Sequence, residues 1–366
     1  MSKYGYILLI ATSLLFSIGI LMVFNTTSAE VLDKSLEVNT HRALLRQVIY
    51  GIIGIGLGLV VYSLNYKNII RLSPLFLFFC IIMLILVFIP KIGVEINGAK
   101  RWISVGGISL QPSEFTKYII PIYFIHQIIQ RKSPDGFISF LKMLLIFILP
   151  ILLILLEPDN GTTAIIVLTL GVVFVLTKIK TIYWVLPLFV MVVIGSSIAY
   201  NMPHVPDRIN AYLHPELDIK GKGHQPYQAK IATGSGRIFG KGLGQSLQKL
   251  NYLPEARSDY IAAIYAEEFG FVGIMFMILL YMMIAYSGFC IAGNANDKEG
   301  FYLSALLSFL ISFQAFLNLG VTSGLLPSKG TTLPFFSQGG TSLIINIMAI
   351  FILMNIDIKT KQWKKV

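Results

Sequence analysis

The chain has 366 residues, of which 55% are hydrophobic and 13% are charged, and its formal net charge is +11. A soluble domain carries about 25% charged residues, so this composition excludes an ordinary soluble protein. Apolar runs of about 18 residues or more indicate spanning helices, because in hydrocarbon only a helix or a closed barrel satisfies its own backbone. The alternating pattern of a barrel is absent from the sequence. We therefore predict an all-α integral membrane protein.

The apolar segments predict about ten transmembrane helices in a single polytopic domain that covers residues 1–366. The fourth is the weakest, since Glu114 and Lys117 fall in its first turn, and an interfacial helix is the alternative there. The expected ranges are 5–24, 48–64, 74–90, 113–129, 138–156, 162–178, 182–200, 259–291, 301–325 and 340–357.

Positively charged short loops indicate the orientation of the chain, because such loops stay in the cytoplasm. The loops NYKNIIRLS, QRKSPDGF and TKIKT and the tail KTKQWKK carry Lys or Arg with almost no acidic residue. An even number of spans then places both termini in the cytoplasm, and the first span is expected to be an uncleaved anchor. With this topology, residues 201–257 form a large extracytoplasmic loop between the seventh and eighth helices.

Basic residues also gather in two predicted external segments, 91–117 and 201–257. One interpretation is a solvated loop or contact with anionic lipid head groups. The other is a site for an anionic ligand, since clustered positive charge concentrates phosphate groups. The stretch GSGRIFGKGLG lacks the spacing of a phosphate-binding P-loop. We expect its glycines to let an interfacial segment approach neighbouring backbone closely.

Two external stretches in the amino-terminal half carry candidate residues. The first, NGAKRWISVGGISLQPSEFTK, is a Gly-rich turn region that contains Arg101 and Lys117. Lys117 has an alternative role, because it can pair with Glu114 three residues earlier. The second, EPDNGTT, places Asp159 where its side chain can cap the sixth predicted helix.

A third stretch, LPEARSDYIAAIYAEEFG, opens the eighth span and puts Glu255, Arg257 and Asp259 at its mouth. Ser258 is the expected N-cap, with Asp259 in the first helical turn, where the helix dipole favours a carboxylate. A rival interpretation places the Asp259 carboxylate over a cavity, because a strip of small residues follows it on nearly one helix face. That strip comprises Ala263, Ala266 and Gly270.

Glu267 and Glu268 lie two turns deeper in the same span, where capping does not explain them. Ionisable groups carried into a membrane usually face a partner, a cavity or a substrate. A buried polar pairing is the expected arrangement for both, with a metal or catalytic role as the alternative.

The fourth stretch, NLGVTSGLLPSKGTTLPFFSQGGTSL, joins the last two spans. Its SQGG segment lies at a predicted helix N-terminus, where free backbone N–H groups suit an anion. Ordinary capping predicts the same residue types, and the nearby Lys329 favours a ligand. The candidate anion-binding residues here are Lys329, Ser337, Gln338, Gly339 and Gly340.

Together the four stretches resemble, in order and spacing, the shape, elongation, division and sporulation (SEDS) family of bacterial cell-wall polymerases. The resemblance runs through nearly the whole chain and is closer to the division-type members than to the elongation-type ones. It implies a ten-helix inverting glycosyltransferase of the bacterial cytoplasmic membrane that polymerises lipid II on the outer face during cell division and releases undecaprenyl pyrophosphate. An elongation-type polymerase is the alternative within the family.

The resemblance also implies roles for individual residues. Asp259 corresponds to the essential acid, which would act as general base on the acceptor sugar hydroxyl. Arg101 and Lys117 match basic positions of the family and, with Arg257, would stabilise the diphosphate leaving group. Arg257 and Ser258 stand where the family often has His and Thr, which casts no doubt on Asp259 itself. Supporting roles are expected for Glu255, Asp159 and Glu267.

The sequence establishes no cofactor, and a divalent cation such as Mg²⁺ or Mn²⁺ at the diphosphate stays open. No S-x-x-K motif with its companions is present, so cross-linking needs a partner. The resemblance implies a class B penicillin-binding transpeptidase and other division proteins, and no nucleic acid. Two other functions stay open: a lipid II flippase or transporter, and a scaffold that recruits the transpeptidase. Basic residues on one face and the lack of an inverted repeat favour the enzyme over the transporter.

Overall fold

The computed structural model is mostly helical, as the composition predicts. It describes residues 1–34, 41–96, 98–105, 108–131, 134, 136–200, 212–213, 221, 223–250, 253, 255–327 and 330–363.

A helix covers each of the ten predicted apolar segments. The first extends to Lys34, beyond its predicted end at 24, and the third begins at Tyr66 because Pro74 is accommodated inside the helix instead of starting it. The bounds are α1 (Lys3–Lys34), α2 (His41–Leu64), α3 (Tyr66–Leu86), α4 (Pro112–Arg131), α5 (Phe137–Leu156), α6 (Asn160–Leu176), α7 (Thr181–Tyr200), α10 (Ile261–Asn294), α11 (Lys298–Thr322) and α12 (Gly340–Trp363).

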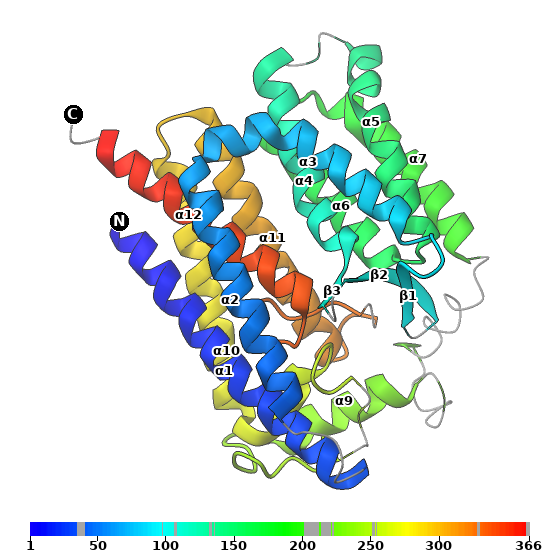
Figure 1. Cartoon of the computed structure of the whole chain (residues 1–366), viewed down its shortest axis with the longest axis vertical. Coiled ribbons are helices and arrows are strands. Elements are labelled where there is room, and N and C mark those ends of the chain that lie inside the picture. The colour runs from blue at the N-terminus through cyan, green and yellow to red at the C-terminus, as the bar shows by residue number, and fades with distance from the viewer. Residues whose placement is uncertain are drawn as a thin grey trace.

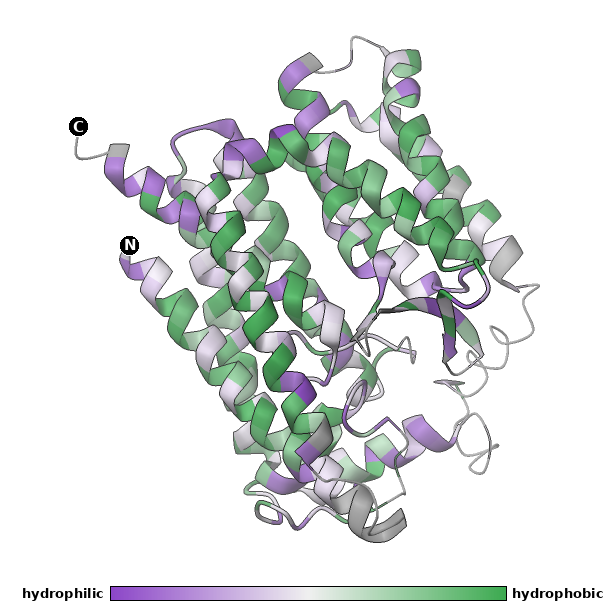
Figure 2. Cartoon of the chain, in the orientation of Figure 1, coloured by the Kyte–Doolittle hydropathy of each residue, from purple (hydrophilic) through white to green (hydrophobic). Residues whose placement is uncertain are grey.

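Within the described residues, seven helices are long and apolar enough to cross a membrane: α1, α2, α3, α5, α10, α11 and α12. The helix α6 is apolar but shorter. Figure 2 shows hydrophobic residues along the middle of the long helices and hydrophilic residues at their ends. These features describe a multi-pass membrane protein.

The helices form two groups (Figure 1). In the first, α12 packs against α2, while α10 packs against both α1 and α11. In the second, α4 packs against α3 and α6. Both chain termini lie at one end of the first group, where the backbone N–H of Ser2 donates to Asp357 over 2.7 Å and the Lys361 ammonium donates to the carbonyl of Met1.

A small antiparallel sheet and a short helix lie at the end away from the termini (Figure 1). The strands β1 (Gly93–Ile96), β2 (Ala99–Val105) and β3 (Ile108–Leu110) pair in the order β1-β2-β3, and the helix is α9 (His224–Ser235). The sequence analysis expected only a Gly-rich turn region in place of the strands. Two sequence signals could have identified the hairpin: the alternation of side chains along KRWISV and the glycine at position 98. In the structure Gly98 adopts a φ of +74° in the turn.

The glycine-rich segment 236–242 fits against a kink in α10, as expected for closely approaching backbones. The kink is at Gly270, whose φ of +66° and ψ of −161° interrupt the helix. A Cβ atom on Gly240 would lie 2.1 Å from the carbonyl oxygen of Glu268, so only glycine fits there. The segment also accepts a hydrogen bond from the N–H of Phe271 through the carbonyl of Arg237, at 2.9 Å. The loop therefore supplies backbone partners that the kinked helix lacks.

Glu267 and Glu268 are buried and paired with lysines of the same loop, as the sequence analysis expected. Lys241 bonds Glu267 over 2.5 Å, and Lys249 bonds Glu268 over 2.8 Å. Asn25 of α1 donates a further hydrogen bond to Glu268 at 2.6 Å. These contacts attach the loop and α1 to the amino-terminal half of α10.

Candidate active site

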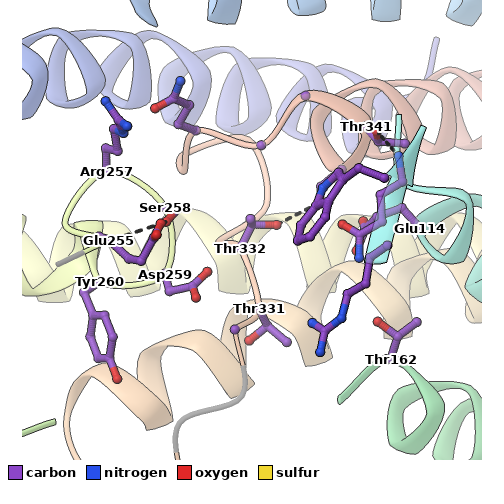
Figure 3. A pocket seen from close by; sticks show the side chains of 18 of the residues that line it. Glu114, Thr162, Glu255, Arg257, Ser258, Asp259, Tyr260, Thr331, Thr332 and Thr341 are labelled. Atoms are coloured by element: carbon purple, nitrogen blue, oxygen red, sulfur yellow. Dashed lines mark hydrogen bonds between the residues drawn. The ribbon is translucent and has the colours of Figure 1, made fainter. Parts of the chain in front are cut away.

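A cavity of about 1010 Å³ collects side chains from both groups of helices. Its wall includes the start of α2, strands β2 and β3, the starts of α4, α6, α9 and α12, the face of α11, and the turn at 255–260. Figure 3 shows part of this wall, with Glu114 and Thr162 on one side and Arg257 on the other. Segments that are far apart in the sequence therefore share one site.

Asp259 lies in a turn that precedes α10, which corrects the expected helix start. The helix begins at Ile261 and its N-cap is Tyr260, without a side-chain capping bond. The prediction that Ser258 caps the helix is wrong, because its hydroxyl donates instead to the Glu255 carboxylate at 2.6 Å. The N–H of Ser258 donates to the carbonyl of Glu255 at 3.1 Å, which closes the turn. Asp259 thus stands ahead of the helix and lines the cavity.

Two long-range hydrogen bonds hold this turn in place. The side-chain amide of Asn318 on α11 donates to the carbonyl of Asp259 at 2.9 Å, and the N–H of Gln338 donates to the carbonyl of Arg257, also at 2.9 Å. In Figure 3 the Asp259 carboxylate points toward the segment that carries Thr331, whereas the Arg257 side chain points away from it. The backbone fixes the position of the carboxylate, while the Arg257 guanidinium lies on the other side of the turn.

Arg101 joins β2 to the start of α6. Its guanidinium donates to the carbonyls of Glu157 and Pro158, at 3.0 and 2.5 Å, and lies 4.0 Å from Asp159. Asp159 caps α6 as predicted, accepting from the N–H of Thr162 at 3.2 Å. Both Arg101 and Asp159 line the cavity, so the cap and the cation belong to the same wall.

Burial perturbs one carboxyl group beside this wall. Glu157 follows the last residue of α5 and is completely buried. Its pKa is raised from 4.5 to about 8, first by burial and then by the charge of Asp159, against the opposing effect of Arg101. Near neutral pH the Glu157 side chain is therefore largely protonated, and the local charge balance is set by Arg101 and Asp159.

The cavity brings together most of the predicted site residues but not all of them. Lys117 is fully buried and bonds Glu114 over 2.6 Å; Glu114 lines the cavity and Lys117 does not. Ser337 is buried behind the wall, where its hydroxyl accepts from the N–H of Leu333 at 2.8 Å. Glu267 lies in the lysine cluster, and Lys329 is outside the described residues. The predicted residues in the wall are Arg101, Asp159, Glu255, Arg257, Asp259, Gln338, Gly339 and Gly340.

The polar residues of the wall that the sequence analysis missed include Arg46 and Gln47 of α2, His224 of α9 and Gln314 of α11. A usable signal existed for Gln314, because a single amide inside an apolar span is costly unless it has a partner or a function. Arg46, Gln47 and His224 lie in polar sequence near helix starts, and only the tertiary structure brings them to the cavity.

No three His, Cys, Asp or Glu side chains among the described residues are grouped so that they could hold a metal ion by themselves. The carboxylates in the cavity wall are divided among α4 (Glu114), the start of α6 (Asp159) and the turn at 255–260 (Glu255 and Asp259). A cation at this site would therefore take much of its coordination from phosphate oxygens and water, as Mg²⁺ often does.

Comparison with known proteins identifies the family. Residues 6–362 match the model of the FtsW, RodA and SpoVE family, described as cell cycle protein. The chain is 36% identical over 98% of its length to the probable peptidoglycan glycosyltransferase FtsW of Trichlorobacter lovleyi, covering 94% of that protein. It is 37% identical over 96% of its length to the protein of the same name from Nitrosomonas europaea, covering 92%.

Two solved structures share the fold. One is a chain of a peptidoglycan synthase complex that coordinates polymerization and crosslinking, with a TM-score of 0.78 and 22% identity over 99% of this chain and 100% of that one. The other is RodA of Thermus thermophilus, with a TM-score of 0.69 and 20% identity over 96% of each chain. The resemblance of the four sequence stretches is thus confirmed, and the chain belongs to the FtsW, RodA and SpoVE family of cell cycle proteins.

Proposed function

We propose that this protein is a peptidoglycan glycosyltransferase that polymerises lipid II into glycan strands during cell division and releases undecaprenyl pyrophosphate. The observation that carries the proposal is the cavity, in which a carboxylate on a fixed turn, Asp259, shares one wall with the cations Arg46, Arg101 and Arg257. Relatives of 36–37% identity that align over nearly the whole chain are named for this activity.

In the proposed reaction, Asp259 is the general base. It accepts the proton of the acceptor sugar 4-hydroxyl as the oxygen forms a bond to the anomeric carbon of the donor, with inversion. The bond from that carbon to the diphosphate breaks, and its electron pair leaves with the diphosphate. A positioned base of this kind contributes about 10²- to 10⁴-fold to the rate. The hydrogen bond from Asn318 to the Asp259 carbonyl supports this role because it holds the base in position.

The diphosphate leaving group needs charge stabilisation more than a proton. Arg101 and Arg257 are proposed to supply it, with the backbone N–H groups of Gly339 and Gly340 at the start of α12 as further donors. Lys117 would act through Glu114, with which it pairs. Lys329, Glu255, Asp159, Ser337 and Glu267 are proposed as supporting residues of the same site.

A divalent cation, Mg²⁺ or Mn²⁺, is proposed to accompany the diphosphate. Asp159, which lies 4.0 Å from the Arg101 guanidinium, and Glu114, which lies on the same side of the cavity as Thr162 in Figure 3, would hold it together with phosphate oxygens. The cation would offset the negative charge that develops on the leaving group. Polymerisation that is unaffected by a chelator would contradict this part of the proposal.

We further propose that ten helices span the membrane, with both termini in the cytoplasm and residues 201–257 as a large extracytoplasmic loop of a single domain. The sheet, α9 and the termini support this orientation, because the sheet and α9 lie at the end away from the termini (Figure 1). The cavity would then open to the outer face of the cytoplasmic membrane, at the division site.

The proposed partners are a class B penicillin-binding transpeptidase and other division proteins. The similarity to a chain of a peptidoglycan synthase complex supports a transpeptidase partner. The substrates would be lipid II and the glycan linked to undecaprenyl pyrophosphate, and no nucleic acid is expected.

The test is lipid II polymerisation by the purified protein with its cognate transpeptidase, comparing wild type with Asp259→Asn and resolving glycan strands on a gel. Strands from wild type only, with equal thermal unfolding of both proteins, are the expected result. Equal strands from both proteins would remove Asp259 from catalysis. Transport of lipid II across vesicle membranes without strands from either protein would indicate a transporter.

A further inference from the structure

Buried side-chain oxygens without a hydrogen-bond partner occur at four positions in the cavity wall. They are the amide oxygens of Gln47, Gln314 and Gln338 and the hydroxyl oxygen of Thr331, each without a partner in the part of the chain that the structure describes. Native proteins leave few buried polar atoms unsatisfied, and each one calls for an explanation. Four in one wall indicate a ligand that completes their hydrogen bonding.

The arrangement of Gln314 connects it to the turn of the catalytic base. Gln314 lies four residues before Asn318 on α11, so both side chains are on the same helix face. Asn318 donates to the carbonyl of Asp259 at 2.9 Å and to the carbonyl of Thr331 at 2.6 Å. Gln314 is 2% exposed. The same face of α11 therefore holds the Asp259 turn and places the Gln314 amide in the cavity wall.

The hydrogen-bonding pattern of Gln47 shows which chemistry its oxygen requires. Its amide nitrogen donates to the carbonyl of Ser337 at 3.0 Å, which fixes the orientation of the amide and leaves the oxygen as an acceptor. An acceptor needs a donor, and the oxygens of an ionised diphosphate offer none. Sugar hydroxyl groups and the N–H of an N-acetyl group are donors.

We propose that Gln314, with Gln47, Gln338 and Thr331, forms a subsite that binds the hydroxyl and N-acetyl groups of a sugar next to Asp259. The proposal rests on the proposed glycosyltransferase function and names the part of its substrate that these residues recognise. The two kinds of side chain would bind different parts of the substrate: the arginines of the wall bind the diphosphate, and the uncharged amides bind the sugar. A site built to hydrogen-bond hydroxyl groups discriminates strongly against a ligand that lacks them, because its buried groups are then left unpaired.

The experiment compares Gln314→Leu with wild type in the complex with the cognate transpeptidase. The KM for lipid II is expected to rise about tenfold, the size of one lost hydrogen bond in a buried site. The inhibition constant of undecaprenyl pyrophosphate, which has no sugar, is expected to stay within about twofold of wild type. The unfolding temperature is expected to stay the same or rise, because leucine removes an unsatisfied buried amide.

Gln127→Leu is the matched control. Gln127 is 3% exposed, both of its amide atoms lack a partner among the described residues, and it lies in α4 outside the cavity wall. This change is expected to affect stability in the same direction and to leave the KM for lipid II unchanged. A rise in KM with Gln127→Leu equal to that with Gln314→Leu would assign the effect to packing and overturn the subsite.

Thr331→Val, which conserves shape, is the second variant and covers the case in which Gln314→Leu does not fold. The same selective rise in KM is expected from it. An unchanged KM in the folded variants overturns the proposal, and so does an equal weakening of lipid II and of undecaprenyl pyrophosphate. A wild-type protein that forms no glycan strands would instead contradict the proposed function, so the two failures are distinguishable.

Discussion

Asn318, buried near the C-terminal end of α11, donates a hydrogen bond to the backbone carbonyl of Asp259, 59 residues earlier in the chain, at 2.9 Å. The same amide nitrogen donates to the carbonyl of Thr331 at 2.6 Å. One side chain on α11 therefore links the turn that carries the proposed base to the segment that its carboxylate faces. The position of the base depends on this bridge as well as on the turn itself.

Replacing Asn318 with Ala is expected to lower kcat by about 10- to 10²-fold, because a small displacement of a catalytic group has an effect of that size. The two carbonyls lose their donor, so stability should fall by about 1–3 kcal/mol. Initial rates of lipid II polymerisation and thermal unfolding measure the two effects. Asn318 is a positioning residue, so binding of undecaprenyl pyrophosphate should be retained; loss of that binding would argue for general misfolding.

The kink of α10 requires glycine at position 270. Gly270→Ala is expected to destabilise the protein by about 3 kcal/mol or more, because its backbone conformation is one that glycine alone adopts readily and the new Cβ would lie 2.3 Å from the backbone nitrogen of Gly240. Gly293 is the control in the same helix, because a Cβ atom added there would have no neighbour within 4 Å. Gly293→Ala should be neutral or stabilise by up to about 1 kcal/mol. Thermal unfolding in detergent distinguishes the two, and equal values would contradict the role of the kink.

Breaking the buried Lys249–Glu268 pair is expected to destabilise the folded protein more than breaking an exposed pair. Both side chains are at most 5% exposed, so Lys249→Met leaves a buried carboxylate without its cation, at a cost of about 3–5 kcal/mol. Lys67→Met breaks the pair with Asp297, whose side chains are 40% and 30% exposed, and should cost no more than about 1 kcal/mol. The denaturation midpoints of Lys249→Met and Lys67→Met measure this difference in stability. The double change Lys249→Met with Glu268→Met should cost less than Lys249→Met alone, since no buried charge is then left unpaired.

Glu157 is expected to make stability depend on pH. Its pKa is 4.5 in the unfolded chain and about 8 in the folded one, so between these values the folded state holds the extra proton. The stabilising effect of that proton is complete below about pH 4.5 and is lost as pH rises through 8. Unfolding temperatures measured from pH 5 to pH 9 should therefore fall for wild type. Glu157→Gln, which stays neutral, should flatten this dependence; parallel curves would show that Glu157 is not the titrating group.

The helices were predictable from the sequence because apolar length is a local property. Asp159 was likewise predicted correctly as a cap, since its partner Thr162 is three residues away. The start of α10 was predicted wrongly, because Ser258 is a residue type that suits an N-cap but its hydroxyl donates to Glu255 in the structure. The strands were missed because glycines obscured a short alternating pattern.

The candidate site was predictable only in part, because some of its residues have local sequence signals and others depend on tertiary contacts. Charges in unusual places pointed to Asp259 and Arg101, which do line the cavity. Gln47 gave no comparable signal, because its importance depends on a hydrogen bond to Ser337 and on neighbours from helices far apart in the chain. The pairing of Lys117 with Glu114 was available from the sequence as an alternative, because the two residues are three apart, whereas the complete burial of Lys117 depends on packing.

The wall of the cavity has a consequence for synthesis of the protein. It runs in sequence from Arg46 to Ser342, and only 24 residues follow the latter in a chain of 366. A nascent chain that still lacks α12 has neither the Gly340 end of the wall nor the helix that packs most extensively against α2. The ribosome thus completes the cavity wall only when α12 has been made, and a chain terminated before α12 inserts into the membrane without the proposed site.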